Sequence, residues 1–251
     1  MNTLLRLMNY LRFSHFDSAH FGGGYEERER FNTGIFISPE RDFLFTKNEK
    51  CGNNTARRTL QNLASRKPLP PDFRDVNRWA WPMLLPSDLG LKRVEDLNAR
   101  IPFKFAIVRN PYARTLSCYI DKFSHGRVNP TGLGKRLGAD TAVDFAGFVE
   151  RICAQEPAQM DPHWRIQYFN IYCDRLRYDR FVKFENYEEE FGALMQRFFG
   201  RREMRNVRKG QHKAELRLAD YYTPEIARAV REKFAIDFET FGYSTELPTQ
   251  T

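Results

Sequence analysis

Residues 42–66, DFLFTKNEKCGNNTARRTLQNLASR, decide the fold, because an apolar run leads through a polar loop into a helical pattern. A short apolar run that ends in such a loop is typical of a buried strand. Leu60 and Leu63 follow it at the spacing of one helical face. Residues 103–123, FKFAIVRNPYARTLSCYIDKF, repeat this order, with Pro111 where the second helix is expected to begin. The chain therefore contains two strand–loop–helix units.

The rest of the chain continues the alternation of strands and helices. A third strand is expected at 180–185, followed by an amphipathic helix, and a closing helix is expected at 224–234. Residues 144–152 are expected to be helical, and Asp161 and Pro162 have the residue types of an N-cap and a first helical position. This alternation predicts an α/β fold, a parallel β-sheet flanked by helices on both faces.

Length and composition favour a single globular domain. The chain has 251 residues, of which 41% are hydrophobic, enough to bury a large core. Residues 1–40 are expected to form an irregular or partly helical extension, because Gly22 to Gly24 precede a charged run. The core is expected at 41–245.

Net charge and cysteine content indicate which kinds of partner and which cellular compartment to expect. A net charge of +8 favours anionic partners. The four cysteines form no C-x-x-C pair, which suggests neither a zinc site nor a disulfide framework and indicates a cytoplasmic protein. The apolar start at 1–13 is too short to span a bilayer, but an amphipathic segment there is compatible with peripheral membrane contact.

The loop at 47–55, KNEKCGNNT, has the features of an anion cradle. Ligands of open parallel sheets bind at the carboxyl ends of strands, where helix N-termini offer free amides. Gly52 lets an anion approach the backbone closely, while Lys47 and Lys50 supply positive charge. The lysines precede the glycine, so the loop lacks the G-x-x-x-x-G-K-[ST] pattern of ATP and GTP hydrolases. An ordinary strand-to-helix turn with surface lysines has the same residues, so this loop alone does not decide the function.

A second candidate anion contact lies at the end of the second strand. Arg109 ends that strand, and Ser117 follows about two helical turns later. Such an arginine can hold a phosphate with two hydrogen bonds, to which a nearby hydroxyl adds a third. A structural salt bridge is an equally common role for an arginine in this place.

Together these segments resemble the carbohydrate sulfotransferases, the group that includes the chondroitin, dermatan and heparan 2-O enzymes and bacterial relatives. Residues 47–55 and 108–123 match, in order, the segments that bind the 5′-phosphosulfate and the 3′-phosphate of the donor in that family. HWRIQ at 163–167, RFVKFENYEEEF at 180–191 and the terminal pattern at 221–243 extend the resemblance over most of the chain.

The resemblance implies a sulfotransferase-type fold with a P-loop-like sheet, and 3′-phosphoadenosine-5′-phosphosulfate (PAPS) as donor, without a metal. Glu49 departs from the family, which usually has proline there, and Asn54 stands where a hydroxyl residue is common. The implied donor contacts are Lys47, Cys51, Gly52, Asn53, Asn54, Thr55, Arg109, Ser117 and Lys209.

Sulfuryl transfer also needs a cation at the leaving oxygen and a base for the acceptor hydroxyl. Lys50 is the expected cation, because transfer depends on positioning and on stabilising charge at that oxygen. His163 is the expected base, and Gln167, one turn later, is expected beside it at the acceptor. A histidine that only caps or packs locally is the alternative. Glu185 is expected either to serve as base or to orient a basic side chain. The resemblance implies that His212 contacts the acceptor.

Two other classes of protein remain open at this point. A nucleic-acid-binding protein is suggested by the net charge of +8 and by basic runs such as 57–67, but no recognised nucleic-acid module is present. A small-molecule kinase would need a nucleoside triphosphate and magnesium, and the Gly-Lys-Ser/Thr element is missing. We therefore expect a carbohydrate or glycolipid acceptor and no nucleic acid partner.

Overall fold

The computed structural model describes residue 16 and residues 24–65, 83–124, 132–139, 142–203 and 214–248. The strands are β1 Ile35–Ser38, β2 Phe43–Thr46, β3 Phe103–Val108 and β4 Arg180–Lys183. The helices are α2 Tyr25–Gly34, α3 Asn53–Ala64, α4 Asp96–Arg100, α5 Pro111–Lys122, α6 Leu133–Leu137, α7 Phe145–Ala154, α8 Gln167–Asn170, α9 Tyr187–Phe199, α10 Leu218–Tyr221, α11 Pro224–Lys233 and α12 Ala235–Phe241. Short 3-10 turns lie at η1 Pro39–Arg41, η3 Pro86–Leu89, η4 Phe184–Asn186 and η6 Glu215–Arg217.

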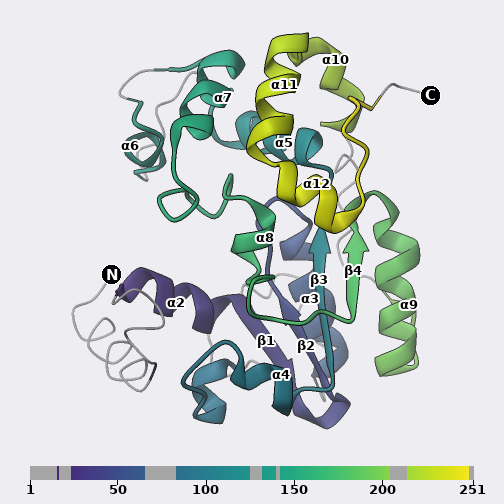
Figure 1. The fold of residues 1–251 in the computed structure, drawn as a ribbon. Helices are drawn as coiled ribbons and strands as arrows, with labels where there is room; N and C mark the ends of the chain where they lie inside the picture. The colour runs from purple at the N-terminus through teal and green to yellow at the C-terminus, as the bar shows by residue number, and fades with distance from the viewer. Residues whose placement is uncertain are drawn as a thin grey trace.

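The strands form one sheet in the order β1-β2-β3-β4 (Figure 1). Strands β2, β3 and β4 run parallel, with Phe43 opposite Phe103 and Phe105 opposite Arg180. Strand β1 pairs antiparallel with β2 at one edge. The predicted parallel α/β sheet is therefore confirmed for three strands, and the carboxyl ends of these strands meet at one edge.

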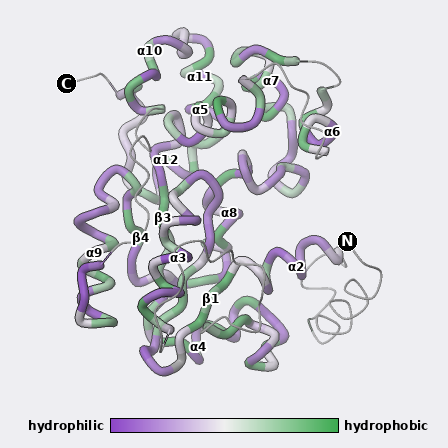
Figure 2. Tube along the Cα trace, turned by 180° about the vertical axis from the view of Figure 1, so that it is seen from behind, coloured by the Kyte–Doolittle hydropathy of each residue, from purple (hydrophilic) through white to green (hydrophobic). Residues whose placement is uncertain are grey.

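Apolar side chains on both faces of the sheet explain why helices cover it. Phe45, Phe105 and Val182 pack on one face against residues of α3 and α9. Ile37 and Leu44, on the other face, pack with residues of α2 and α4. Figure 2 shows hydrophobic residues concentrated in the strands, whereas the helices alternate between hydrophobic and hydrophilic positions. The alternation is typical of helices with one face on a core.

A second layer of helices stands at the carboxyl end of the sheet (Figure 1). Helices α5, α7 and α11 pack against one another around Trp164, Phe148 and Phe234, which are almost fully buried. Helix α5 belongs to this layer, yet it starts directly after β3. The candidate site at the end of β3 therefore lies between the sheet and the helical layer.

Two local predictions are corrected by the structure. The expected irregular start contains helix α2 and strand β1, and β1 is part of the sheet, so the folded core begins before residue 41. The helix expected after Asp161 is a turn, and α8 begins only at Gln167. Asp161 caps this turn, because its carboxylate accepts a hydrogen bond from the His163 amide at 3.0 Å. The other predicted strands and helices are confirmed to within a few residues.

Some predictions fall on residues that the structure does not describe. The N-terminal segment at 1–13, Lys209 and His212 lie outside the described residues. Among the described helices, none is long and apolar enough to cross a membrane. The four cysteines have free thiols.

Candidate functional site

The loop from Lys47 to Gly52 connects β2 to α3 at the carboxyl edge of the sheet. Gly52 adopts a left-handed conformation, with φ 75°, and among the described residues no side chain caps the helix that follows. Amides in the first turn of a helix have no intrahelical acceptor, so an uncapped turn attracts anions. The Asn53 carboxamide turns back to accept from the Asn48 amide at 3.0 Å and fixes the loop. The predicted cradle thus has the required backbone form.

The side chains of this loop differ in their partners and in their exposure to solvent. Lys47 Nζ lies 2.5 Å from Glu49 Oε1. Burial works to raise the pKa of Glu49, but the charge and hydrogen bond of Lys47, together with neighbouring groups, hold that pKa below its usual value. The Cys51 side chain is fully buried, and burial raises the pKa of its thiol to about 12. The predicted donor contact of Cys51 can therefore involve only its backbone. Asn54 is exposed and Thr55 is buried.

Replacing Gly52 with alanine is expected to cost about 2–4 kcal/mol of unfolding free energy and to weaken donor binding. A Cβ at Gly52 would lie 2.9 Å from Cε2 of Phe184, on a backbone with φ 75°. The Phe184 ring lies under the Arg109 guanidinium, 4.5 Å from it, so a shift of the ring would move Arg109 as well. Denaturant unfolding and calorimetry with adenosine 3′,5′-bisphosphate measure the two effects.

Gly90→Ala is the matched control for this change. Gly90 has φ 64°, and a Cβ there would meet nothing within 4 Å. Its replacement should cost only the backbone strain of about 1–2 kcal/mol and leave nucleotide affinity unchanged. Equal losses of stability and affinity in the two variants would show that the contact of Gly52 with Phe184 is unimportant.

Arg109 joins the two predicted anion-binding segments. Its Nη1 donates to the Lys50 carbonyl oxygen at 3.0 Å. Its Nε and Nη2 contact Glu215 Oε1 at 2.7 and 2.6 Å. The side chain is only 3% exposed. The end of β3 and the loop after β2 therefore lie in direct contact. This proximity is required if one donor molecule binds at both places. Ser117 lies half-buried on α5.

Glu215→Gln is expected to raise the affinity for adenosine 3′,5′-bisphosphate about three- to tenfold. The Glu215 carboxylate occupies the donors of Arg109 that the predicted 3′-phosphate would need, and it would repel that phosphate. Glutamine keeps the size but removes the charge. Calorimetry at two salt concentrations measures the change, because a charge effect weakens with salt. A lower affinity of the variant would mean that Glu215 instead holds Arg109 in the binding orientation.

Lys50 occupies a strained position at the centre of the loop. Its φ of 67° is uncommon for a residue with a long side chain. Its Nζ lies 3.0 Å from Asp121 Oδ2 on α5. Burial works to raise the pKa of Asp121, but the charges and hydrogen bonds of Lys50 and Lys122 together hold that pKa below its usual value. The loop backbone is thus held in an unusual conformation next to the predicted leaving oxygen.

His163 forms a pair with Asp161 beside this loop. Its Nδ1 lies 2.6 Å from Asp161 Oδ1. Burial works to raise the pKa of Asp161, but hydrogen bonds from His163 hold that pKa below its usual value. A carboxylate that accepts from Nδ1–H leaves Nε2 free to take a proton. The sequence predicted His163 as base but treated Asp161 only as a cap.

Arg114 connects His163 to the donor loop. Its Nε donates to the Glu49 carbonyl oxygen and its Nη2 to the Pro162 carbonyl oxygen, both at 3.0 Å. The residues that follow these two carbonyls are Lys50 and His163. One buried guanidinium therefore holds the predicted cation and the predicted base near each other. Sequence analysis did not single out Arg114, although its place within the 108–123 segment was a signal.

Gln167 has a structural position, which corrects its predicted contact with the acceptor. The side chain is fully buried. Its Oε1 accepts from the Arg109 amide and from Asn48 Nδ2, each at 3.0 Å. Its backbone amide donates to Asp237 at 2.8 Å. Burial raises the pKa of Asp237 to about 6. Gln167 therefore ties the strand end to the loop, and the sequence could not show this because the partners are remote.

Glu185 lies under the turn after β3, where it orients backbone and side chains. Its Oε1 accepts from the Asn110 amide at 2.8 Å, and its Oε2 accepts from the Tyr243 hydroxyl at 2.8 Å. Both oxygens are thus engaged within the protein. Of the two roles that the sequence left open, the orienting one fits these contacts, although Glu185 orients a backbone amide rather than a basic side chain.

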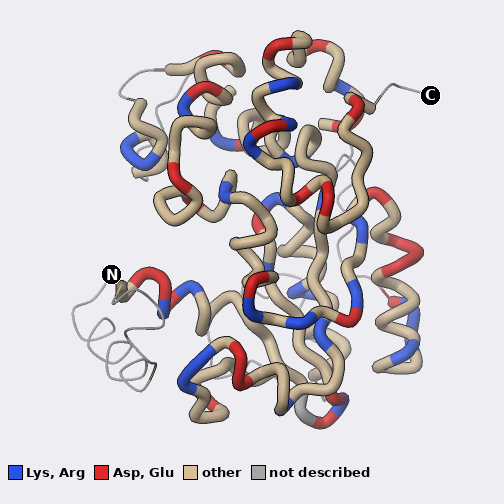
Figure 3. The backbone as a smooth tube through the Cα atoms, viewed as in Figure 1, with Lys and Arg blue, Asp and Glu red and all other residues tan. Residues whose placement is uncertain are grey.

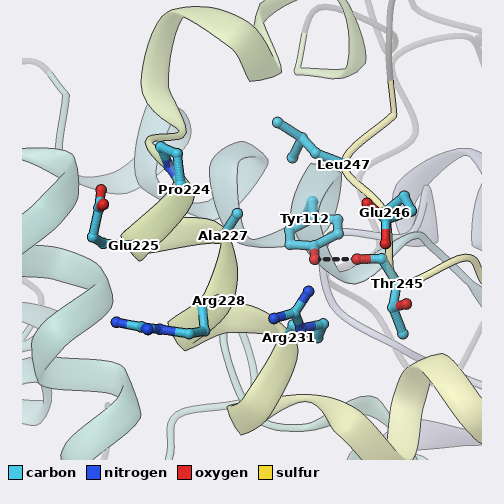
Figure 4. A pocket seen from close by; sticks show the side chains of 9 residues that line it. All are labelled: Tyr112, Pro224, Glu225, Ala227, Arg228, Arg231, Thr245, Glu246 and Leu247. Atoms are coloured by element: carbon cyan, nitrogen blue, oxygen red, sulfur yellow. Dashed lines mark hydrogen bonds between the residues drawn. The ribbon is translucent and has the colours of Figure 1, made fainter.

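The larger of the two described cavities does not coincide with the predicted site. It has a volume of about 370 Å³ and lies between α11 and the C-terminal segment (Figure 4). Arg228 and Arg231 extend along it from one face of α11, and the Tyr112 hydroxyl donates to the Thr245 carbonyl oxygen at its wall. None of the predicted site residues lines it. Figure 3 shows basic and acidic residues interspersed along the described chain, without a one-signed stripe.

Comparison with known proteins identifies the family of this chain. Residues 33–244 match the sequence model of the sulfotransferase family. The chain belongs to the sulfotransferase family, which confirms the resemblance expected from the sequence. No solved structure matches the chain.

Two curated relatives carry the same name, carbohydrate sulfotransferase 14. The protein from Danio rerio is 24% identical over 245 residues, which make up 90% of this chain and 65% of the relative. The protein from Mus musculus is 27% identical over 173 residues, or 60% of this chain and 45% of the relative. The chain thus spans less than two thirds of either relative.

Proposed function

We propose that the protein transfers a sulfuryl group from PAPS to a hydroxyl of a carbohydrate or glycolipid acceptor. The observation that carries this proposal is the contact of Arg109 with the Lys50 carbonyl, which brings both predicted ends of the donor into one site. Membership of the sulfotransferase family supports the reaction, and the names of the two relatives support the class of acceptor. Cytoplasmic residence and peripheral membrane contact stay predictions.

The residues at the site fit a nucleotide with a phosphate at each end. The uncapped first turn of α3 and Lys50 would hold the 5′-phosphosulfate, while Arg109 and Ser117 would hold the 3′-phosphate after Arg109 exchanges Glu215 for it. The donor is a substrate, and transfer without a metal stays a prediction.

The chemistry follows from the positions of Lys50 and His163. The acceptor oxygen attacks sulfur in line with the bond to the 5′-phosphate, and that S–O bond breaks as the new one forms. His163 Nε2 takes the acceptor proton, and Asp161 stabilises the imidazolium through Nδ1. Lys50 and the helix amides stabilise the negative charge that develops on the leaving phosphate oxygen. The products are a sulfate ester, adenosine 3′,5′-bisphosphate and a proton.

Two measurements test the proposed function. Calorimetry should show micromolar binding of adenosine 3′,5′-bisphosphate and much weaker binding of ATP with magnesium. Incubation with ³⁵S-labelled PAPS should label at least one of desulfated chondroitin, dermatan or heparan. Preference for ATP with magnesium would favour the kinase alternative, and salt-sensitive retention on DNA without nucleotide affinity would favour a nucleic-acid-binding protein.

A further inference from the structure

A small cavity lies beside the donor loop, at the end of the sheet formed by β1 and β2. Its volume is about 50 Å³, and Arg30, Lys47, Glu49, Pro162 and Tyr172 contribute to its wall. This volume is well below the range of about 300–1,000 Å³ for sites that enclose a whole small molecule. The cavity can therefore take one arm of a larger ligand.

The cavity lies on the side of the site where an acceptor must approach. In the proposed function, the 3′-phosphate lies at the end of β3 and the sulfuryl group at the loop after β2, so the donor runs from β3 towards β2. An in-line attack comes from the side opposite the leaving oxygen. The next strand in that direction is β1, and the cavity is bounded there by Gly34, whose carbonyl accepts from the Lys47 amide at 2.7 Å.

Tyr172 gives this cavity an unused hydrogen-bonding group. Its side chain is only 4% exposed, and its hydroxyl has no hydrogen-bond partner among the described residues. A buried hydroxyl without a partner costs free energy, so such a group calls for a ligand or a water. Burial raises the pKa of Tyr172 well above its usual value, so the hydroxyl stays neutral and can both donate and accept.

The charges around the cavity favour a neutral ligand group. Lys47 Nζ lies 2.5 Å from Glu49, and Arg30 Nη1 lies 3.1 Å from Glu27. Each cation of the wall is therefore balanced by a carboxylate at contact distance. A carboxylate or sulfate entering this space would have to displace one of these carboxylates, whereas a hydroxyl or hydroxymethyl group would not.

We propose that this cavity is an acceptor subsite that receives one neutral, hydroxyl-bearing arm of the acceptor sugar, with the Tyr172 hydroxyl as its hydrogen-bond partner. The inference rests on the proposed function, because the direction of approach is set by the donor. It assigns Tyr172 and the side of the site facing β1 to acceptor recognition.

Tyr172→Phe tests the subsite with a change of one oxygen atom. In protein saturated with adenosine 3′,5′-bisphosphate, the Kd for unsulfated chondroitin, dermatan or heparan oligosaccharides, measured by calorimetry, should rise about two- to tenfold. The affinity for the nucleotide itself should not change. The Tm of the free protein should stay the same or rise, because an unpartnered buried hydroxyl is removed.

Tyr178→Phe is the matched control. Tyr178 is a neighbouring tyrosine whose hydroxyl donates to the Ile171 carbonyl oxygen at 2.5 Å. Its replacement leaves a buried carbonyl without this donor, so the Tm should fall while the Kd for the oligosaccharide stays unchanged. Opposite effects of the two variants on Tm and Kd would separate a ligand-binding hydroxyl from a structural one.

Three results would overturn the subsite. An unchanged oligosaccharide Kd for Tyr172→Phe removes the proposed hydrogen bond. A fall in Tm equal to that of Tyr178→Phe assigns the hydroxyl to a structural water. Wild-type protein that binds the nucleotide but none of the three oligosaccharides excludes a sugar arm while leaving the donor site intact. Failure to bind the nucleotide would instead refute the proposed function.

Discussion

Replacing Lys50 with alanine is expected to lower kcat about 10²–10³-fold, while the Kd for adenosine 3′,5′-bisphosphate changes less than about tenfold. The amides of the first turn of α3 and Arg109 would still hold the two phosphates. The charge that builds up on the leaving oxygen exists only during transfer, so losing its cation affects turnover more than binding. Single-turnover measurements with labelled PAPS separate the two effects.

Lys122→Ala is the matched control, because Lys122 and Lys50 share one carboxylate. Lys122 Nζ lies 3.1 Å from Asp121 Oδ2, the same oxygen that Lys50 contacts at 3.0 Å. Removing Lys122 changes the pairing of Asp121 without changing the charge in the loop, so kcat should stay within about twofold. If Lys50→Ala has no larger effect than Lys122→Ala, Lys50 is not part of the transfer step.

His163→Ala is expected to lower kcat about 10²–10⁴-fold without weakening the binding of adenosine 3′,5′-bisphosphate. The variant loses the group that takes the proton from the acceptor hydroxyl. Asp161→Asn should lower kcat by a smaller factor, because the carboxylate 2.6 Å from Nδ1 orients the imidazole.

Comparison of the two variants distinguishes a catalytic histidine from a capping one. The Asp161 carboxylate also accepts from the His163 amide, so its replacement by asparagine affects the turn as well. Damage to the turn alone would lower Tm together with kcat, and Asp161→Asn would then be as impaired as His163→Ala. Normal activity of His163→Ala would assign the residue to local packing, and Glu185 could not replace it as base while its two oxygens accept from Asn110 and Tyr243.

Local patterns were sufficient to predict the central part of the fold. The apolar runs of β2 and β3 are followed by loops and by helices with one apolar face, and these signals lie within a few residues of one another. Strand β1 was not predicted because three glycines and a charged run precede it in the sequence. In the structure that run belongs to α2. Pairing with β2 supplies the stabilisation that the local sequence does not indicate.

Long-range contacts explain why the candidate site was only partly predicted. Lys50, Arg109 and His163 were identified from their places after strands and turns. The carboxylates that pair with them were not all visible, since Asp121 on α5 and Glu215 in η6 are remote in sequence from Lys50 and Arg109, their partners. Gln167 was misplaced for a related reason. Its predicted face assumed a helix starting at residue 162, whereas the structure has a turn there.

A crystal structure with adenosine 3′,5′-bisphosphate would show most directly whether the ends of β2 and β3 share one ligand. We expect the 5′-phosphate on the amides at the start of α3 beside Lys50, and the 3′-phosphate on Arg109 with Glu215 displaced. A nucleotide seated instead between α11 and the C-terminal segment, with Arg109 still bound to Glu215, would contradict it.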